Sequence, residues 1–345
     1  MATVVVVSSR GVQTRFPYVQ SAWVRQTEHM IGLGRKRRDK KARTPKAVWS
    51  DWLKANDAGD AERAGQFAAE MTRVAPDSYY SWFEAALHAK ARRDWPRSLE
   101  WNQRATELFG EAEASDFGGD NPAAWNLGIA ATAVGDWATA RRAWTMYGVA
   151  GLDDGAGPIH GNFGSAPIRL NPDRPTLSLQ VVPEFGTTEV VWSRRRSPAH
   201  AVITSVPLPE SGHRFGDVLL HDGEPKGTRW LDDVEVSVFD EIDKLQDSEL
   251  GTWQAQVENA TTDDFDALGE IAYRYELGAD NWSGINVLCS ACSHGSPDPQ
   301  HSHQPAPDGT TMVGLGGIEG DISRCIEEWT DSRQGVRVLN VEFLW

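Results

Sequence analysis

Three segments between residues 47 and 150 carry the same succession of apolar, polar and turn-forming positions. Each has a turn pair that ends in aspartate and, four residues later, a small residue that would let two helices approach closely. The three copies run from Gly59-Asp60 to Ala64, from Arg93-Asp94 to Ser98, and from Gly135-Asp136 to Ala140. The pattern predicts three helical hairpins, in each of which the turn pair ends the first helix.

The spacing of these copies resembles the tetratricopeptide repeat, a helix-turn-helix unit of 34 residues whose stacked copies share one core. The first two aspartates lie 34 residues apart, and a longer interval before the third places an insertion at residues 110–121. The third copy matches best, with Leu127-Gly128 and Trp144 at family positions, whereas the first has Asp51-Trp52 in place of Leu-Gly. The resemblance covers residues 47–150, and the alternative is an unrelated helical bundle with chance Gly-Asp turns.

The resemblance also implies which side chains face the concave surface of the stack. In this family they lie one place after the first signature position of each copy and one helical turn further along. Here these positions hold Trp49, Phe83 and Trp125, followed by Leu53, Leu87 and Ile129. Two occupants of such an apolar groove remain open: a partner peptide, or another part of the same chain.

After the helical region the residue composition and the pattern of apolar positions change. Residues 151–175 are rich in Gly, Pro, Asp and Asn, which predicts a linker. Residues 176–250 then alternate short apolar runs with Pro and Gly, which predicts a small β-rich domain with a strongly bent sheet or a partly closed barrel. The expected strands are Leu177–Val182, Glu189–Trp192, Ala201–Val206, Asp217–Leu220 and Val234–Phe239, with a hairpin-turn signal at His221-Asp222-Gly223.

Residues 251–345 predict a second domain in which strands and helices alternate. Strands are expected at Thr252–Glu258, Ile285–Leu288, Thr310–Leu315 and Val336–Leu344, and helices from a cap at Thr261 to about Leu277 and over Asp321–Thr330. This β-α-β-β-α-β order is that of the ferredoxin-like split fold. The fold class expected for the whole chain is therefore α+β and multidomain.

Composition excludes several broad classes. The chain has 345 residues, of which 40% are hydrophobic and 24% charged, which is typical of globular proteins. No run approaches the roughly 20 apolar residues of a membrane span, and three cysteines argue against a disulfide framework, so a cytoplasmic location is expected. Arginine outnumbers lysine 26 to 8, a bias associated with GC-rich bacterial genomes.

Charge is distributed unevenly along the chain. The net charge is −15, yet residues 35–46 hold eight basic side chains and one acidic one. Residues 1–46 are expected to be a basic, disordered extension that does not belong to the helical region. Because the rest of the chain is strongly acidic and would repel a phosphate backbone, nucleic acid is disfavoured as a partner.

The densest candidate chemistry lies between the two middle strands of the last domain. Cys289 and Cys292 form a Cys-x2-Cys pair, and His294, His301 and His303 follow closely. Two thiolates and two imidazoles would complete a tetrahedral zinc site, with His294 as substitute for either later histidine, and four protein ligands favour a structural role. A polar loop with reduced thiols and a redox dithiol are the alternatives.

A glycine-rich segment also has the outline of a nucleotide-binding motif. Gly314-Leu-Gly316-Gly-Ile-Glu-Gly320 follows an expected strand and precedes an expected helix, and Glu342 ends the next strand. A tight strand-to-helix turn explains these glycines more simply.

These observations leave two classes of function open. The favoured one is a non-enzymatic adaptor or scaffold that binds a protein or peptide through the helical groove. The alternative is a metal-dependent hydrolase or thiol enzyme in the C-terminal region, with the repeats recruiting its substrate.

Overall fold

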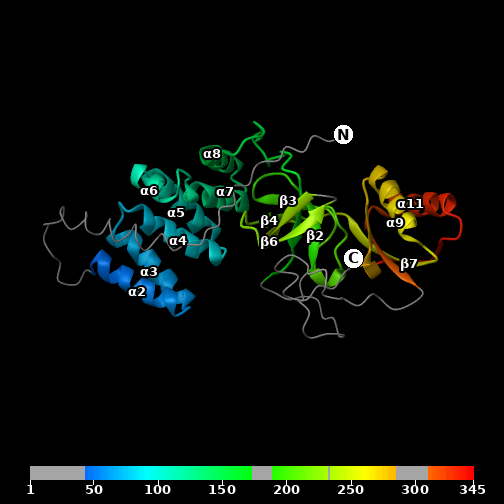
Figure 1. Cartoon of the computed structure of the whole chain (residues 1–345), viewed down its shortest axis with the longest axis horizontal. Coiled ribbons are helices and arrows are strands. Elements are labelled where there is room, and N and C mark those ends of the chain that lie inside the picture. The colour runs from blue at the N-terminus through cyan, green and yellow to red at the C-terminus, as the bar shows by residue number, and fades with distance from the viewer. Residues whose placement is uncertain (1–42, 173–188, 232–233, 285–309) are drawn as a thin grey trace. The chain divides into compact units, whose positions relative to one another are not determined.

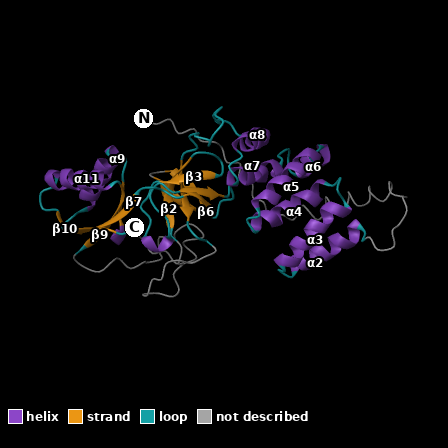
Figure 2. Ribbon diagram, turned by 180° about the vertical axis from the view of Figure 1, so that it is seen from behind, coloured by secondary structure: helices purple, strands orange, loops and turns teal. Residues whose placement is uncertain are grey.

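The computed structural model of the chain describes residues 43–172, 189–231, 234–284 and 310–345. The chain divides into two compact units, Met1–Ile159 and His160–Trp345. Helices alone form the described part of the first unit, whereas the second contains both sheets (Figures 1 and 2). The helices of the described residues include none that is long and apolar enough to cross a membrane.

Over residues 43–159, the first unit consists of three helical hairpins and one short inserted helix. The helices are α2 (Pro45–Asp57), α3 (Ala61–Val74), α4 (Tyr79–Ala91), α5 (Trp95–Leu108), α6 (Glu111–Asp116), α7 (Pro122–Ala133) and α8 (Trp137–Tyr147). Each predicted hairpin is present, as α2–α3, α4–α5 and α7–α8, and α6 lies in the predicted insertion. This arrangement is compatible with tetratricopeptide-like repeats.

The aspartate of each turn pair caps the helix that follows it. Its carboxylate accepts a hydrogen bond from the backbone N–H three residues further on, which satisfies a donor that the first helical turn leaves unpaired. The donors are Arg63 at 3.1 Å, Arg97 at 3.4 Å and Thr139 at 3.0 Å. The repeated Asp thus fixes where each second helix begins.

Small residues allow the helices of a hairpin to approach closely. The three predicted positions, Ala64, Ser98 and Ala140, are fully buried. In the third hairpin a Cβ atom at Gly128 would lie 2.6 Å from the ring of Trp144, so this glycine makes room for the indole. Packing around these positions is therefore set by side-chain size, as the sequence predicted.

The second unit begins with a six-stranded sheet, five strands of which close into a barrel. The strands are β1 (Ser165–Arg169), β2 (Val190–Arg195), β3 (His200–Ile203), β4 (Val218–His221), β5 (Gly227–Leu231) and β6 (Val234–Gln246). The order β1-β2-β3-β4-β6 is closed by parallel pairing of β1 with β6, and β5 extends the sheet from the beginning of β6. The sequence predicted a strongly bent sheet or a partly closed barrel, and the structure contains a barrel that is closed by the pairing of β1 with β6.

Strand β1 corrects the predicted linker. It lies within residues 151–175, and its Ile168 joins Leu170, Val191 and Leu219 in the apolar core of the barrel. The hairpin signal at residues 221–223 is also wrong, because β5 pairs with β6 and not with β4. The expected strand over residues 177–182 lies outside the described residues.

The rest of the second unit, as far as the structure describes it, is a four-stranded antiparallel sheet with two α-helices. Its elements are β7 (Gly251–Glu258), α9 (Thr262–Arg274), β8 (Gly278–Asn281), β9 (Thr311–Gly317), α11 (Glu319–Ser332) and β10 (Arg337–Phe343). Their order is the predicted β-α-β-β-α-β, and the strands are arranged β10-β7-β9-β8. Strand β8 was not anticipated, and the expected strand at residues 285–288 lies outside the described residues. Sheet and barrel belong to one compact unit, where the sequence predicted two domains.

The glycines of the candidate nucleotide motif serve packing inside a strand. Gly314, Gly316 and Gly317 all belong to β9, so the strand-to-helix turn is a wrong interpretation for them. An added Cβ would lie 2.1 Å from Trp282, 2.4 Å from Phe215 and 2.0 Å from Leu277, respectively. The space that a phosphate would need at these glycines is thus filled by the chain's own side chains.

Candidate functional site

The six predicted groove residues lie on the first helices of the three hairpins but differ in exposure. Phe83 and Ile129 have 1% and 0% of their surface exposed and belong to the interior, and Trp49 is also buried at 8%. These three residues are therefore not available to a partner in this structure. The other three, Leu53, Leu87 and Trp125, remain partly exposed.

The insertion explains why the middle of the expected groove is covered. The ring of Phe117, which follows α6, lies 5.9 Å from that of Tyr79 and 6.1 Å from that of Phe83. The hydroxyl of Tyr80 donates a hydrogen bond of 2.8 Å to Asp116. Around Phe83 the chain itself therefore covers the surface, whereas Leu87, one turn further along α4, stays partly exposed.

Hydrogen bonds between successive hairpins fix the positions of the first helices. The indole N–H of Trp52 donates to Nε2 of His88 at 3.1 Å, and Nζ of Lys90 donates to Oδ1 of Asn126 at 2.9 Å. Burial and the nearby Arg92 lower the pKa of His88, so its ring is neutral and can accept this bond. The three partly exposed residues are thus held on linked helices.

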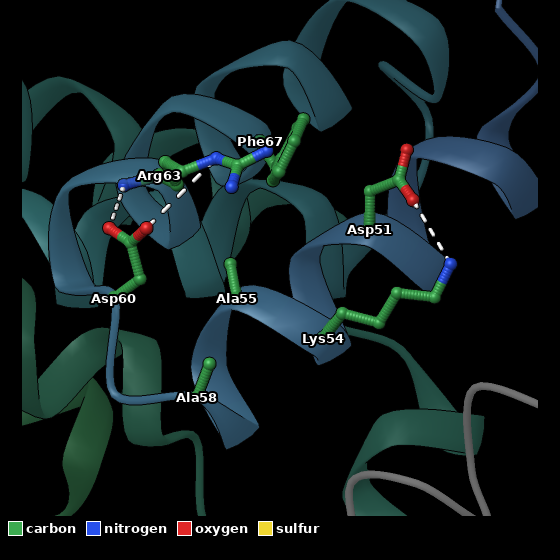
Figure 3. A pocket seen from close by; sticks show the side chains of 7 residues that line it. All are labelled: Asp51, Lys54, Ala55, Ala58, Asp60, Arg63 and Phe67. Carbon is green, nitrogen blue, oxygen red and sulfur yellow. Dashed lines mark hydrogen bonds and ion pairs between the residues drawn. The ribbon is translucent and has the colours of Figure 1, made fainter.

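A hollow of about 260 Å³ lies between the ends of α2 and α3 (Figure 3). Its lining residues are Asp51, Lys54, Ala55, Ala58, Asp60, Arg63 and Phe67. The charged side chains form ion pairs with one another, Lys54 with Asp51 at 3.4 Å and Arg63 with Asp60 at 4.0 Å. Because these charges are already paired within the hairpin, the hollow is better explained by helix packing than by a ligand.

The predicted zinc ligands cannot be placed. Cys289, Cys292, His294, His301 and His303 all lie outside the described residues. Within the described ranges no group of three or more His, Cys, Asp or Glu side chains could hold a metal ion. The zinc site stays a prediction.

The barrel contains a buried ion pair that the sequence did not reveal. Nε2 of His213 lies 2.9 Å from Oε1 of Glu241, and both side chains are buried. Nδ1 of His213 lies 2.9 Å from the carbonyl oxygen of Ser211. Both ring nitrogens of His213 therefore lie within hydrogen-bond distance of an oxygen atom. No local signal could have predicted this pair, since its members lie 28 residues apart.

A serine and a histidine lie in contact at the turn between β2 and β3. Oγ of Ser197 lies 2.7 Å from Nδ1 of His200, the geometry of a nucleophile and its base. However, Ser197 is fully buried, and its oxygen also accepts the backbone N–H groups of Ala199 and His200 at 3.1 Å. The serine therefore shapes the turn and is not available to a substrate.

Two partly buried carboxyl groups accept hydrogen bonds from the segment that follows β3. Oε2 of Glu189 accepts the N–H of Leu208 at 3.1 Å, and Asp280 accepts the N–H of Val206. Burial raises the pKa of Glu189 to about 8 and that of Asp280 to about 6. The indole of Trp282 donates to the carbonyl of Val206 at 2.8 Å. These bonds join the barrel to the four-stranded sheet.

Comparison with known proteins gives little guidance. No protein-family model matches the chain, and no curated protein shows significant similarity to it. Among solved structures, a mutant O-GlcNAc transferase from Thermobaculum terrenum matches with a TM-score of 0.23 and 18% identity. The match covers 33% of this chain and 21% of the transferase chain. So low a TM-score supports no inference about fold or function.

Proposed function

We propose that this chain is a non-enzymatic interaction protein, an adaptor or scaffold that binds a polypeptide partner through its helical hairpins. The observation that supports the proposal is that the first helix of each hairpin carries a partly exposed apolar residue at a predicted groove position. They are Leu53 on α2, Leu87 on α4 and Trp125 on α7. An extended segment of a partner that crosses the three helices would bury all three.

The surface of this row is apolar and its supports are rigid. The ring of Trp125 packs against the second helix of its own hairpin. Its centroid lies 5.0 Å from the ring centroid of Trp144 and 4.8 Å from that of Tyr147. A partly exposed aromatic ring held in this way loses little side-chain entropy on binding, which is a property of residues that contribute strongly to interfaces. Trp125 is therefore the proposed anchor.

Finer assignments belong to the same proposal. We assign the hairpins to the tetratricopeptide repeat and the C-terminal sheet with its two helices to the ferredoxin-like arrangement. We also propose that Cys289, Cys292, His301 and His303, with His294 as substitute, bind one structural zinc ion, and that the protein works in the cytoplasm. The strand order β10-β7-β9-β8 supports the assignment of the C-terminal sheet to the ferredoxin-like arrangement.

The test is a quantitative comparison of captured partners. Full-length protein and the variants Trp125→Ala and Leu87→Ala are used as bait in lysate of the native host. A specific partner should be lost with both variants, while Met146→Ala, which removes an exposed side chain of α8, retains it. An unchanged set of captured proteins would refute the proposed surface. Trp125→Ala should keep the helical unit folded, because its ring is only partly buried.

A further inference from the structure

Three consecutive arginines end strand β2, at the turn into β3. Arg194, Arg195 and Arg196 form no ion pair with any part of the chain that the structure describes. This is unusual in a chain of net charge −15, where many other arginines do pair with acidic side chains. Like charges in a row repel one another, and the neighbouring Arg194 helps to lower the pKa of Arg196.

The middle arginine points toward the interior of the barrel. Arg195 lies on the same face of β2 as Val191 and Ser193, both of which are buried in the barrel. Its guanidinium carbon lies 5.0 Å from the ring centroid of Phe239, and Nη2 donates to the carbonyl of Pro198 at 3.2 Å. Its Nε is buried and has no hydrogen-bond partner among the described residues. Burial lowers the pKa of Arg195 only to about 10, so the group stays charged.

A histidine faces the same ring from β4. The ring centroid of His221 lies 5.2 Å from that of Phe239. Nδ1 of His221 donates to the carbonyl of Asp222 at 2.9 Å, whereas Nε2 is buried and meets no hydrogen-bond partner in the described parts of the chain. Burial and the nearby Arg195 lower the pKa of His221 to about 3. The ring is therefore neutral, and Nε2 presents a lone pair.

Ser193 adds a third polar atom that no group in the described ranges pairs with. Its Oγ is buried two residues before Arg195 on the same face of β2. An unsatisfied buried polar group costs about 1–3 kcal/mol, and an unpaired buried charge costs more. Because Arg195 keeps some contact with solvent, a ligand can reach it from outside. The arrangement thus offers donors, one acceptor and an uncompensated positive charge.

We propose that this end of the barrel binds a small phosphate-class oxyanion between Arg195 and His221. The planar guanidinium matches the spacing of two phosphate oxygens, and Arg194 and Arg196 attract the anion. The neutral Nε2 of His221 accepts the hydrogen of a protonated phosphate oxygen, and Ser193 donates to another oxygen. Sulfate has no such hydrogen at neutral pH, so the site prefers phosphate over sulfate.

The test uses inorganic phosphate and inorganic sulfate with the full chain at matched ionic strength. Isothermal titration calorimetry should detect phosphate binding, with sulfate weaker. Arg195→Met should weaken phosphate binding about ten- to a hundredfold, because it removes a charge-assisted hydrogen bond. The same variant should raise the melting temperature in phosphate-free buffer, since it removes a buried unpaired charge. Arg337→Gln, on the exposed strand β10, serves as the matched control and should bind normally.

Other outcomes separate a site from general salt effects. His221→Ala should remove the preference for phosphate over sulfate. Should Arg195→Met fail to fold, Arg194→Gln combined with Arg196→Gln should weaken binding without loss of the fold, because neither side chain is buried. Equal stabilisation of the wild type and Arg195→Met by both anions would indicate exclusion of these salts from the protein surface and would overturn the proposal. The absence of binding heat with phosphate would mean that water already satisfies the polar atoms of Arg195, His221 and Ser193. That result would also overturn the proposal.

Discussion

At the scale of single residues, some buried charged groups in the described ranges are paired and others are not. In the barrel, His213 and Glu241 satisfy each other, and Arg169 pairs with Asp240. In the helical unit, Glu84 on α4 is only 8% exposed, and burial raises its pKa from 4.5 to about 7. Such a carboxyl group is neutral in weakly acidic solution and becomes a destabilising charge above its raised pKa.

Glu84 therefore predicts a pH-dependent stability of the helical unit. Between the unfolded pKa of 4.5 and the folded pKa of about 7, the folded state binds more protons than the unfolded state. The contribution of Glu84 to the free energy of unfolding is fully present below the unfolded pKa of 4.5. It is lost as the pH rises through the folded pKa of about 7, and the total loss is about 3 kcal/mol. Glu84→Gln should remove this loss and make the unit more stable than wild type at about pH 8.

Urea unfolding followed by far-ultraviolet circular dichroism at several pH values measures this difference. Glu100→Gln, on the exposed surface of α5 in the same hairpin, should leave the pH dependence of the wild type unchanged. If Glu84→Gln shows the same loss between about pH 5 and pH 8 as wild type, Glu84 does not carry it.

At the scale of elements, the turn of each hairpin has the same backbone conformation. The residue before the capping aspartate has a positive φ in all three: 70° at Gly59, 56° at Arg93 and 72° at Gly135. A side chain in this left-handed region costs about 1–2 kcal/mol. Arg93 bears this cost, so the second hairpin has the strained turn.

Substitutions at these turns should have opposite signs. Gly59→Ala should destabilise the helical unit by about 1 kcal/mol, although a Cβ there has open space, because only the backbone is strained. Arg93→Gly should be neutral or slightly stabilising, because relief of strain offsets the greater freedom of glycine in the unfolded chain. Gly269→Ala, in helix α9 and equally open, is the matched control and should stabilise its own unit by about 0.5–1 kcal/mol. Thermal unfolding of full-length variants is the measurement, and an equal effect of both Gly→Ala changes would contradict this account.

These turns also show what the sequence could predict. The hairpins were predictable because the signals are local, a turn residue and a capping aspartate at fixed spacing. Strand β1 was not, since it lies in a segment rich in turn formers, and the partner of its Arg169 is Asp240, 71 residues away. The glycines of β9 were misread for the same reason, because the rings that fill their space come from other elements.

The candidate binding surface was predictable only in part. The repeat register correctly placed six residues on the first helices, and three of them are partly exposed. It could not show that Phe117 from the insertion covers Phe83, because an insertion has no equivalent position in a repeat. In the sequence, a run of three arginines at residues 194–196 was the sole sign of the anion site that we propose at the end of the barrel.

At the scale of the whole molecule, the two proposed functions lie in different units. Partner binding is assigned to Leu53, Leu87 and Trp125 in the first unit, and the oxyanion to Arg195 and His221 in the second. Because each unit has its own core, a change that harms one core need not unfold the other. The two proposals can therefore fail independently, and variants in one unit serve as controls for the other.

The zinc prediction tests the same independence with a single experiment. Protein purified without a histidine tag should contain one zinc ion per chain by elemental analysis, and Cys289→Ser with Cys292→Ser should remove it, because zinc requires the two thiolates. Metal binding stabilises the fold in which its ligands converge, so loss of the ion should lower the unfolding temperature of the second unit alone. The helical unit, followed by circular dichroism, should unfold as in wild type.

Zinc well below one ion per chain, or a zinc content that the double substitution leaves unchanged, would exclude these ligands. Cys325→Ser, which alters the buried cysteine of α11, is the control and should retain the metal.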